Sequence, residues 1–173
     1  KQPIVAVDTE TTGLDPHTAK LVGVSLAGVA KQAFYIPLGH IDPLTHELLP
    51  GQMSNDEAKA LLKPFFENEK IKKVGQNLKF DSQIFKTWGV ELRGIAADTL
   101  LESYLLQPEE PHNLDALALK YLAHETIKYE DLTGKGKGQI SFAEVSIEKA
   151  TEYSAEDSDI AFRLHEKFAP ERS

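Results

Sequence analysis

The sequence has no cysteine among its 173 residues, so the chain forms no disulfide and builds no thiolate metal site. No apolar run approaches the roughly 20 residues that a membrane-spanning helix requires, and no basic-then-apolar leader opens the chain. We therefore expect a soluble, cytoplasmic protein without a membrane partner. The chain starts abruptly before its first strand and stops soon after its last helix, which indicates a domain excised from a larger protein.

Basic residues are also few, because 19 lysines and arginines face 27 acidic residues and leave a net charge of −8. Phosphate binding usually needs a basic face, so this sign alone argues against a nucleic-acid partner. The argument fails if several acids are metal ligands, because bound divalent cations reverse the local field. The length and the 41% hydrophobic content are enough for one well-filled core, and we expect residues 1–173 to form a single domain.

The stretch IVAVDTET at residues 4–11 is the feature around which the rest is arranged. Its apolar, mostly β-branched start predicts a strand buried on both faces, with the carboxylates at its C-terminal end. Asp8 and Glu10 are two residues apart, so both carboxylates point to the same side. Two anions this close repel unless a cation or a proton lies between them. The alternative is a solvated strand end that runs into the turn at 13–16.

A second acidic position follows the short strand expected at 72–76, where the chain turns into a helix. Asp81 lies near the start of that helix, where the helix dipole alone favours an acid, and Asn77 is also a common turn residue. A third acidic position lies on the final helix, expected at 147–167.

On that final helix Tyr153 and Asp157 are one turn apart and share a face with apolar residues. An aspartate on an apolar face is costly to bury unless it is paired or binds a metal. Glu156 and Asp159 fall on other sides of the helix, and we assign them to solvent.

Two further strands are predicted at 21–27 and 32–37, joined by a turn around Gly28, so that the chain begins as a three-stranded meander. We expect His40 and His46, which lie in the following loop at 38–53, to be exposed to solvent.

A capping box at Ser54 predicts a helix to about Asn68, in which Pro64 introduces a kink or an early end. Its predicted core residues are Leu61, Leu62, Phe65 and Phe66. A last strand is expected at 94–97. Helices should follow that strand, one capped by Asp98 and another starting at Asn113. The segment GKGKG at 134–138 is either a mobile basic loop that contacts a phosphate backbone or a plain linker.

Taken together, Asp8-x-Glu10, Asn77-x-x-x-Asp81 and Tyr153-x-x-x-Asp157 resemble the three exonuclease motifs of the DEDD superfamily, in its tyrosine-bearing branch. The wider sequence is similar to the 3′-5′ proofreading domain of bacterial DNA polymerase I across essentially the whole chain. The similar stretches are 8–11, 21–25, 35–37, 74–81, 91–96, 98–104, 134–137 and 155–157.

The resemblance implies that Asp8, Glu10 and Asp157 ligate one divalent metal ion, and that Asp8 also reaches a second. Asp81 would hold the second ion largely through water. Tyr153, together with Glu10, would orient the attacking water. All four acids of the family's site are present.

The same resemblance implies substrate-binding residues beside the acids. Leu14 would wedge beside the 3′-terminal base, and Gln76 and Asn77 would lie along the substrate strand. Thr9 would also bind the substrate. The substrate would be a single-stranded or frayed 3′ end of DNA, because unstacking a paired end costs on the order of 1 to 2 kcal/mol per step.

The implied fold is α/β and ribonuclease H-like, with a mixed central sheet of about five strands flanked by helices. The implied function is a 3′-5′ exodeoxyribonuclease that removes 5′-mononucleotides by two-metal hydrolysis, covalently linked to a polymerase domain in DNA replication and repair. All-oxygen ligation favours Mg²⁺ or Mn²⁺, with Zn²⁺ accepted in vitro. Two alternatives stay open: an RNA-processing exonuclease resembling RNase D, and a catalytically silent nucleic-acid-binding scaffold.

Overall fold

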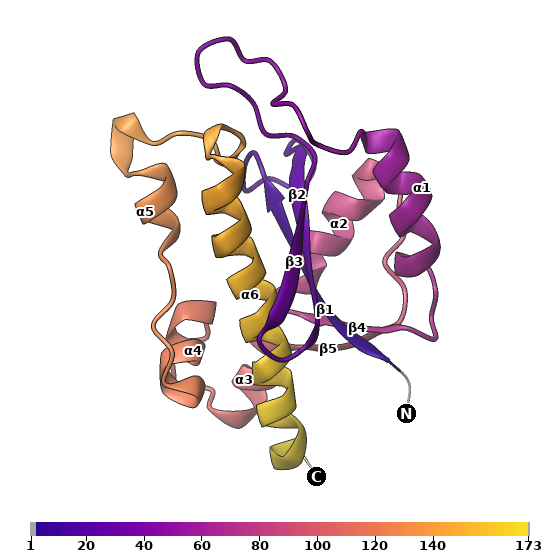
Figure 1. The fold of residues 1–173 in the computed structure, drawn as a ribbon. Helices are drawn as coiled ribbons and strands as arrows, with labels where there is room; N and C mark the ends of the chain where they lie inside the picture. The colour runs from indigo at the N-terminus through magenta and orange to yellow at the C-terminus, as the bar shows by residue number, and fades with distance from the viewer. Residues whose placement is uncertain (1–2, 173) are drawn as a thin grey trace.

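The computed structural model describes residues 3–172 and contains one five-stranded sheet in the order β3-β2-β1-β4-β5 (Figure 1). β1 pairs antiparallel with β2, and β2 pairs antiparallel with β3, whereas β1 pairs parallel with β4, and β4 pairs parallel with β5. The strands are β1 Ile4–Thr11, β2 Leu21–Val29, β3 Gln32–Pro37, β4 Lys72–Gly75 and β5 Ile95–Asp98. This mixed sheet confirms the predicted α/β class.

Helices cover both faces of the sheet (Figure 1). They are α1 Asn55–Phe66, α2 Leu78–Trp88, α3 Thr99–Leu106, α4 Leu114–Leu122, α5 Tyr129–Thr133 and α6 Ile147–Phe168. Three short 3-10 helices are η1 Gly136–Gly138, η2 Phe142–Glu144 and η3 Ala169–Arg172. Among the described residues, no helix is both long and apolar enough to cross a membrane.

The central strand β1 is buried on both sides, as predicted. Ala6 packs with Ala161 and Phe162 of α6, whereas its neighbour Val7 belongs to a second cluster with residues of α1 and α2. Both side chains are 0% exposed. Successive residues of a strand point to opposite faces, so this arrangement also decides which helix each polar residue at the end of β1 meets.

The predicted turn around Gly28 is wrong. β2 continues to Val29, and the turn is formed by Ala30 and Lys31, where Lys31 has a positive φ of 64°. The register between β2 and β3 shifts between Ala27 and Val29. Gly28 therefore marks an irregularity inside the strand, which is a common position for glycine.

Helix α1 starts as predicted, because the Ser54 hydroxyl accepts a hydrogen bond from the Glu57 N–H at 3.2 Å. Pro64 lies inside the helix and does not end it. Leu62 and Phe66 are buried, but Leu61 is 61% exposed, so its predicted place in the core is wrong. Leu61 is one residue before Leu62 and is thus rotated by about 100° from the buried stripe.

Of the two loop histidines, His46 is exposed as predicted, but His40 is 0% exposed. The prediction for His40 is wrong because its ring has partners on two distant segments. These partners are the Tyr35 hydroxyl and the Val145 carbonyl. Hydrogen bonds to both ring nitrogens offset the cost of removing the imidazole from water.

Glu156 and Asp159 of α6 were assigned to solvent, and that assignment is wrong. Glu156 accepts a hydrogen bond from the Ile127 N–H, and Asp159 accepts one from the Lys31 N–H. α6 lies along the sheet, so the segment before α5 and the β2–β3 turn cover sides of the helix that the sequence pattern alone leaves open.

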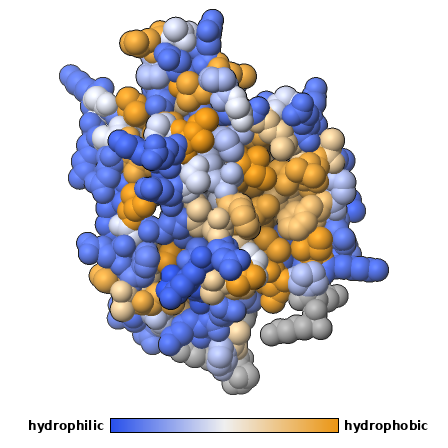
Figure 2. Space-filling model, in the orientation of Figure 1, coloured by the Kyte–Doolittle hydropathy of each residue, from blue (hydrophilic) through white to orange (hydrophobic). Residues whose placement is uncertain are grey.

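Apolar side chains gather on the surface between β3 and α1 (Figure 2). Phe34 of β3 is 70% exposed and lies opposite Leu26 of β2, while Leu61 of α1 is also exposed. Among the described residues, the one group of acids close enough to share a metal ion lies elsewhere, at the edge of the sheet described below.

Replacing Gly75 with alanine is expected to lower the free energy of unfolding by about 1 to 3 kcal/mol. A methyl group there would lie 2.7 Å from the Val7 carbonyl oxygen, which belongs to the paired strand and has little room to move. Gly13→Ala is the matched control, because the same methyl group meets nothing within 4 Å. Urea denaturation of both variants measures the difference, and equal stabilities would contradict the prediction.

Candidate active site

Strand alternation at the end of β1 distributes three polar side chains between two helices. Asp8 and Glu10 share the face of Ala6, which packs against α6, and Thr9 shares the face of Val7, which packs against α2. The two carboxylates therefore meet α6, and Thr9 meets α2. The end of β1 thus faces both helices that carry the other candidate acids.

On the α6 side, Asp8, Glu10 and Asp157 each place a carboxylate oxygen within 4.8 Å of the other two. Asp157 reaches the strand because the neighbouring Ser154 and Ser158 are small and 0% exposed, which lets α6 pack closely. Glu10 Oε1 is buried and has no hydrogen-bond partner among the described residues. A buried acceptor without a donor is costly, and a cation would satisfy it.

On the α2 side, the Asp81 carboxylate is held by Thr9. Asp81 Oδ1 accepts hydrogen bonds from the Thr9 N–H at 2.9 Å and from the Thr9 hydroxyl at 2.6 Å. Asp81 is only 3% exposed. The hydroxyl of Thr9 is thereby committed to orienting this carboxylate.

The start of α2 is fixed by Asp98 at the end of β5. The Asp98 carboxylate accepts hydrogen bonds from the N–H groups of Asn77 and Leu78, at 2.9 and 2.7 Å. Asn77 has a left-handed φ of 61°, a conformation that asparagine tolerates better than most residues. This tight junction places Asp81 on the first turn of the helix.

Burial raises the pKa values of all four carboxyls, and charge repulsion raises those of Glu10, Asp81 and Asp157 further. Removal from water raises the pKa of Asp8 from 3.8 to about 7. Burial, followed by the charge of Asp8, raises the pKa values of Glu10, Asp81 and Asp157 well above their usual range. Such a group of acids favours bound protons or a bound cation.

These residues open into a cleft of about 550 Å³. The cleft-lining residues are Asp8, Thr9, Glu10, Thr11, Thr12, Gly13, Leu14, Phe80, Tyr129, Gln139, Ile140, Ser141, Tyr153 and Asp157. None of these described residues is basic, so the carboxylates have no cationic side chain in the cleft wall. Leu14 is 93% exposed on the loop after β1.

Tyr153 lies in the cleft one helical turn before Asp157. Burial raises the pKa of the Tyr153 hydroxyl, and the charges of Asp157 and Glu10 raise it further. The hydroxyl therefore stays protonated at neutral pH and serves as a hydrogen-bond donor.

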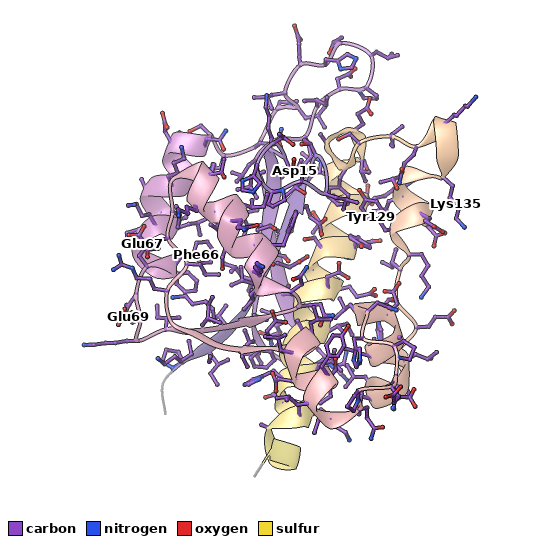
Figure 3. The ribbon with its side chains drawn as sticks, turned by 180° about the vertical axis from the view of Figure 1, so that it is seen from behind. Asp15, Phe66, Glu67, Glu69, Tyr129 and Lys135 are labelled. Carbon is purple, nitrogen blue, oxygen red and sulfur yellow. The ribbon has the colours of Figure 1, made fainter. Side chains whose placement is uncertain are left out.

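Sequence reasoning missed Tyr129, whose ring centre is 6.0 Å from that of Tyr153. Tyr129 opens the short helix α5 and lies between α5 and α6 (Figure 3). An isolated aromatic residue at the start of a five-residue helix has no periodic pattern, so no sequence signal pointed to it. The basic loop at 134–138 is absent from the residues that line the cleft, and Lys135 is paired with Glu130 at 2.8 Å.

Gln76 and Asn77 lie at the same edge of the sheet but differ in their bonding. The Gln76 amide donates to the His112 carbonyl and accepts from the Thr99 hydroxyl, so both ends of the amide are engaged inside the protein. The Asn77 side chain makes no cap hydrogen bond and is exposed. Their contact with a substrate strand stays a prediction.

Comparison with known proteins identifies the family of the chain. A family profile described as 3′-5′ exonuclease, from the DNA polymerase A family, matches residues 1–172. The chain belongs to this exonuclease family. DNA polymerase I of Pseudomonas aeruginosa is 43% identical over 166 residues, which cover 94% of this chain and 18% of that protein. The chain thus spans about a fifth of the length of this curated relative.

Solved structures share the fold of this exonuclease domain. NrnC of Brucella melitensis, solved with bound Mg²⁺, has a TM-score of 0.70 at 22% identity and covers 99% of this chain and 75% of its own. RNase D of Escherichia coli, an exoribonuclease involved in structured RNA processing, has a TM-score of 0.64 at 20% identity, over 98% of this chain and 39% of its own. At these identities the likeness shows the ribonuclease H-like exonuclease fold and no more.

Proposed function

We propose that this chain is the proofreading domain of a DNA polymerase I and removes 5′-mononucleotides from DNA 3′ ends by metal-dependent hydrolysis. The observation that carries the proposal is the convergence of the carboxylates of Asp8, Glu10 and Asp157 within 4.8 Å, in a cleft without a basic side chain. The partner of the domain is a covalently linked polymerase region in a longer, cytoplasmic chain. The name of the Pseudomonas aeruginosa relative, DNA polymerase I, and the 18% of its length that this chain covers support this part of the proposal.

The donor set fits hard divalent cations. All donors at the carboxylate cluster are oxygens, which suit Mg²⁺ and Mn²⁺, and Zn²⁺ also accepts carboxylates. Asp8, Glu10 and Asp157 would hold one ion, and Asp8 with Asp81 would hold a second. The buried, unpartnered Glu10 Oε1 supports this assignment, as does the Mg²⁺ bound by NrnC. When bound, the ions supply the positive charge that activates water and stabilises the incoming and leaving oxygens.

The protein's own residues position the reactants. The protonated Tyr153 hydroxyl, beside Glu10, donates a hydrogen bond that orients the attacking water toward the phosphorus. Thr9 keeps the Asp81 carboxylate in one orientation through its two hydrogen bonds. Leu14, exposed at the rim of the cleft, contacts the terminal base, and Asn77 contacts the strand behind it. No side chain acts as a covalent nucleophile.

Selection of mismatched ends follows from access rather than base reading. The terminal nucleotides must leave the duplex to enter the cleft, and each unstacked step costs on the order of 1 to 2 kcal/mol. A mispaired end has already lost part of that stacking. The domain therefore acts faster on single strands and mismatched ends than on paired ends, with little dependence on base identity.

The expected result with a 5′-labelled single-stranded DNA oligonucleotide is stepwise shortening from the 3′ end, with release of 5′-mononucleotides, in Mg²⁺ or Mn²⁺ and none in chelator. Gel analysis of the shortened strands measures it, with Asp8→Ala as the inactive control. A sequence-matched RNA oligonucleotide separates the DNA enzyme from an exonuclease of the RNase D kind. Faster cleavage of RNA would favour the second assignment, and no cleavage with either metal would contradict both.

A further inference from the structure

His40 is fully buried in the loop between β3 and α1, and all its polar atoms have partners. Its N–H donates to the Gln52 side-chain oxygen, and its carbonyl accepts from the Gln52 amide, each at 2.8 Å. Its ring Nδ1 is 2.9 Å from the Val145 carbonyl oxygen, and Nε2 is 2.7 Å from the Tyr35 hydroxyl. The side chain therefore links β3 to the segment that precedes α6.

The direction of these hydrogen bonds follows from the chemistry of the partners. A carbonyl oxygen only accepts, so His40 Nδ1 carries the proton and donates it to Val145. Nε2 is then an acceptor, and the Tyr35 hydroxyl donates to it. Burial lowers the pKa of His40, which keeps the ring neutral and this arrangement intact.

The ring of Tyr35 lies over Gly23 of β2, where a methyl group would overlap the Tyr35 hydroxyl and ring. Gly23 is the residue that pairs with Glu10 across β1 and β2. The charge of Glu10 also contributes to the raised pKa of Tyr35, second to burial. The linked pair of Tyr35 and His40 therefore lies beside the carboxylate cluster.

The same pair lies behind Tyr153. The His40 ring centre is 6.0 Å from that of Phe142, and Phe142 is 5.9 Å from Tyr153. Tyr35 and Tyr153 pack against one apolar cluster that contains Phe142 and Val145. Val145 directly precedes Ser146, the residue that caps α6. Movement of His40 would shift both the start of α6 and the ring against which Tyr153 packs.

We propose that His40 and Tyr35 are positioning residues that hold the Tyr153 hydroxyl in place at the carboxylate cluster. This inference rests on the exonuclease activity proposed above. A displacement of about 1 Å in a catalytic geometry costs up to about 10²-fold in rate, so loss of this support lowers the catalytic rate without removing a substrate contact.

The test uses Tyr35→Phe, which removes only the hydroxyl, and His40→Asn. The asparagine amide N–H can replace Nδ1 as the donor to Val145, but the shorter side chain has no acceptor at the position of Nε2. Both should lower kcat by about tenfold and leave KM for the oligonucleotide within about twofold. His46→Asn is the matched control from the same loop, and its activity should equal that of the wild type. Circular dichroism at the assay temperature verifies that each variant is folded.

A double-mutant cycle with Tyr153→Phe separates positioning from general support of the fold. If His40 and Tyr35 act through Tyr153, adding Tyr35→Phe to Tyr153→Phe causes no further loss of kcat. A full tenfold further loss, a loss confined to KM, or unchanged activity in both single variants would overturn the inference. An inactive wild type would overturn the proposed function and this inference together, whereas an active wild type with equally active variants overturns only this inference.

A second measurement does not depend on activity. Nitrogen NMR of the His40 ring should show the proton on Nδ1 at neutral pH and a change of the Nε2 signal in Tyr35→Phe. A proton on Nε2 would overturn the inference, because Tyr35 would then not be held by His40.

Discussion

Replacing Asp8 with asparagine is expected to lower kcat by about 10³-fold or more and, at the same time, to stabilise the metal-free protein. The loss of activity follows because a metal ligand contributes to several kcal/mol of charge stabilisation, and each 1.36 kcal/mol is a factor of about ten. The gain in stability follows because Asp8 is partly buried beside Glu10 and Asp157, and its charge also acts on Asp81. An amide of the same shape removes one of the repelling charges.

The size of the stabilisation follows from the raised pKa. Burial raises the pKa of Asp8 from 3.8 to about 7, so above neutral pH ionised Asp8 destabilises the metal-free fold. We expect Asp8→Asn to raise the free energy of unfolding in chelator at pH 8 by about 1 to 4 kcal/mol. Thermal melts and denaturant titrations measure this difference, and the nuclease assay measures the loss of activity on the same preparation.

The matched control for this experiment is Asp131→Asn. Asp131 is an exposed aspartate of α5, and its replacement should change stability by less than about 0.5 kcal/mol and leave activity unchanged. A destabilised Asp8→Asn protein in chelator would show that the carboxylate is structural rather than a strained ligand. Retained activity would contradict its assignment to the catalytic site.

Without metal, the protein is expected to lose stability as pH rises from about 6.5 to 8, and divalent cations should restore it. The folded state binds more protons than the unfolded state, because the carboxyls of Asp8, Glu10, Asp81 and Asp157 have pKa values raised above those of free side chains. Their stabilising protonation is complete below about pH 4 and is lost as pH passes through the raised values. Each extra proton held by the folded state gives a slope of about 1.4 kcal/mol per pH unit.

The pH window excludes two other buried groups. The pKa of His40 is lowered in the folded state. This residue therefore destabilises the fold only at pH values below about 6.5, the pKa of histidine in the unfolded chain. Lys73, whose pKa is lowered to about 8, acts in the opposite direction above that pH. Melting temperatures in chelator and in Mg²⁺ across this window are the measurement. A flat profile in chelator, or no upward shift with Mg²⁺ or Mn²⁺, would contradict the metal site.

Local patterns predicted most of the fold. The β-branched run before Asp8 indicated a central strand, and β1 is buried on both faces. The predicted caps at Ser54 and Asp98 placed the starts of two helices correctly. Spacing alone also indicated that Asp8 and Glu10 share one side. Each of these features depends on neighbours within a few residues, which is why the sequence reveals them.

The wrong predictions for His40, Glu156 and Asp159 concern contacts between distant segments. His40 appeared to be a loop histidine, but Tyr35 and Val145 meet it from opposite sides. Glu156 appeared to face solvent, yet it accepts a hydrogen bond from the backbone 29 residues away. A residue outside any apolar repeat is predicted to face solvent. Whether a distant segment of the chain packs over it depends on the tertiary fold.

The sequence by itself determined the order of the main elements, because propensity, capping and alternation act over short distances. Its resemblance to the exonuclease motifs indicated the α/β class and the four acids. Only the tertiary structure decided that Asp157 approaches Asp8 and Glu10, that Thr9 orients Asp81, and that their pKa values rise together. These properties arise from packing α6 and α2 onto opposite faces of β1. The size of each pKa shift depends on burial and on the distances between the carboxylates, and this packing sets both.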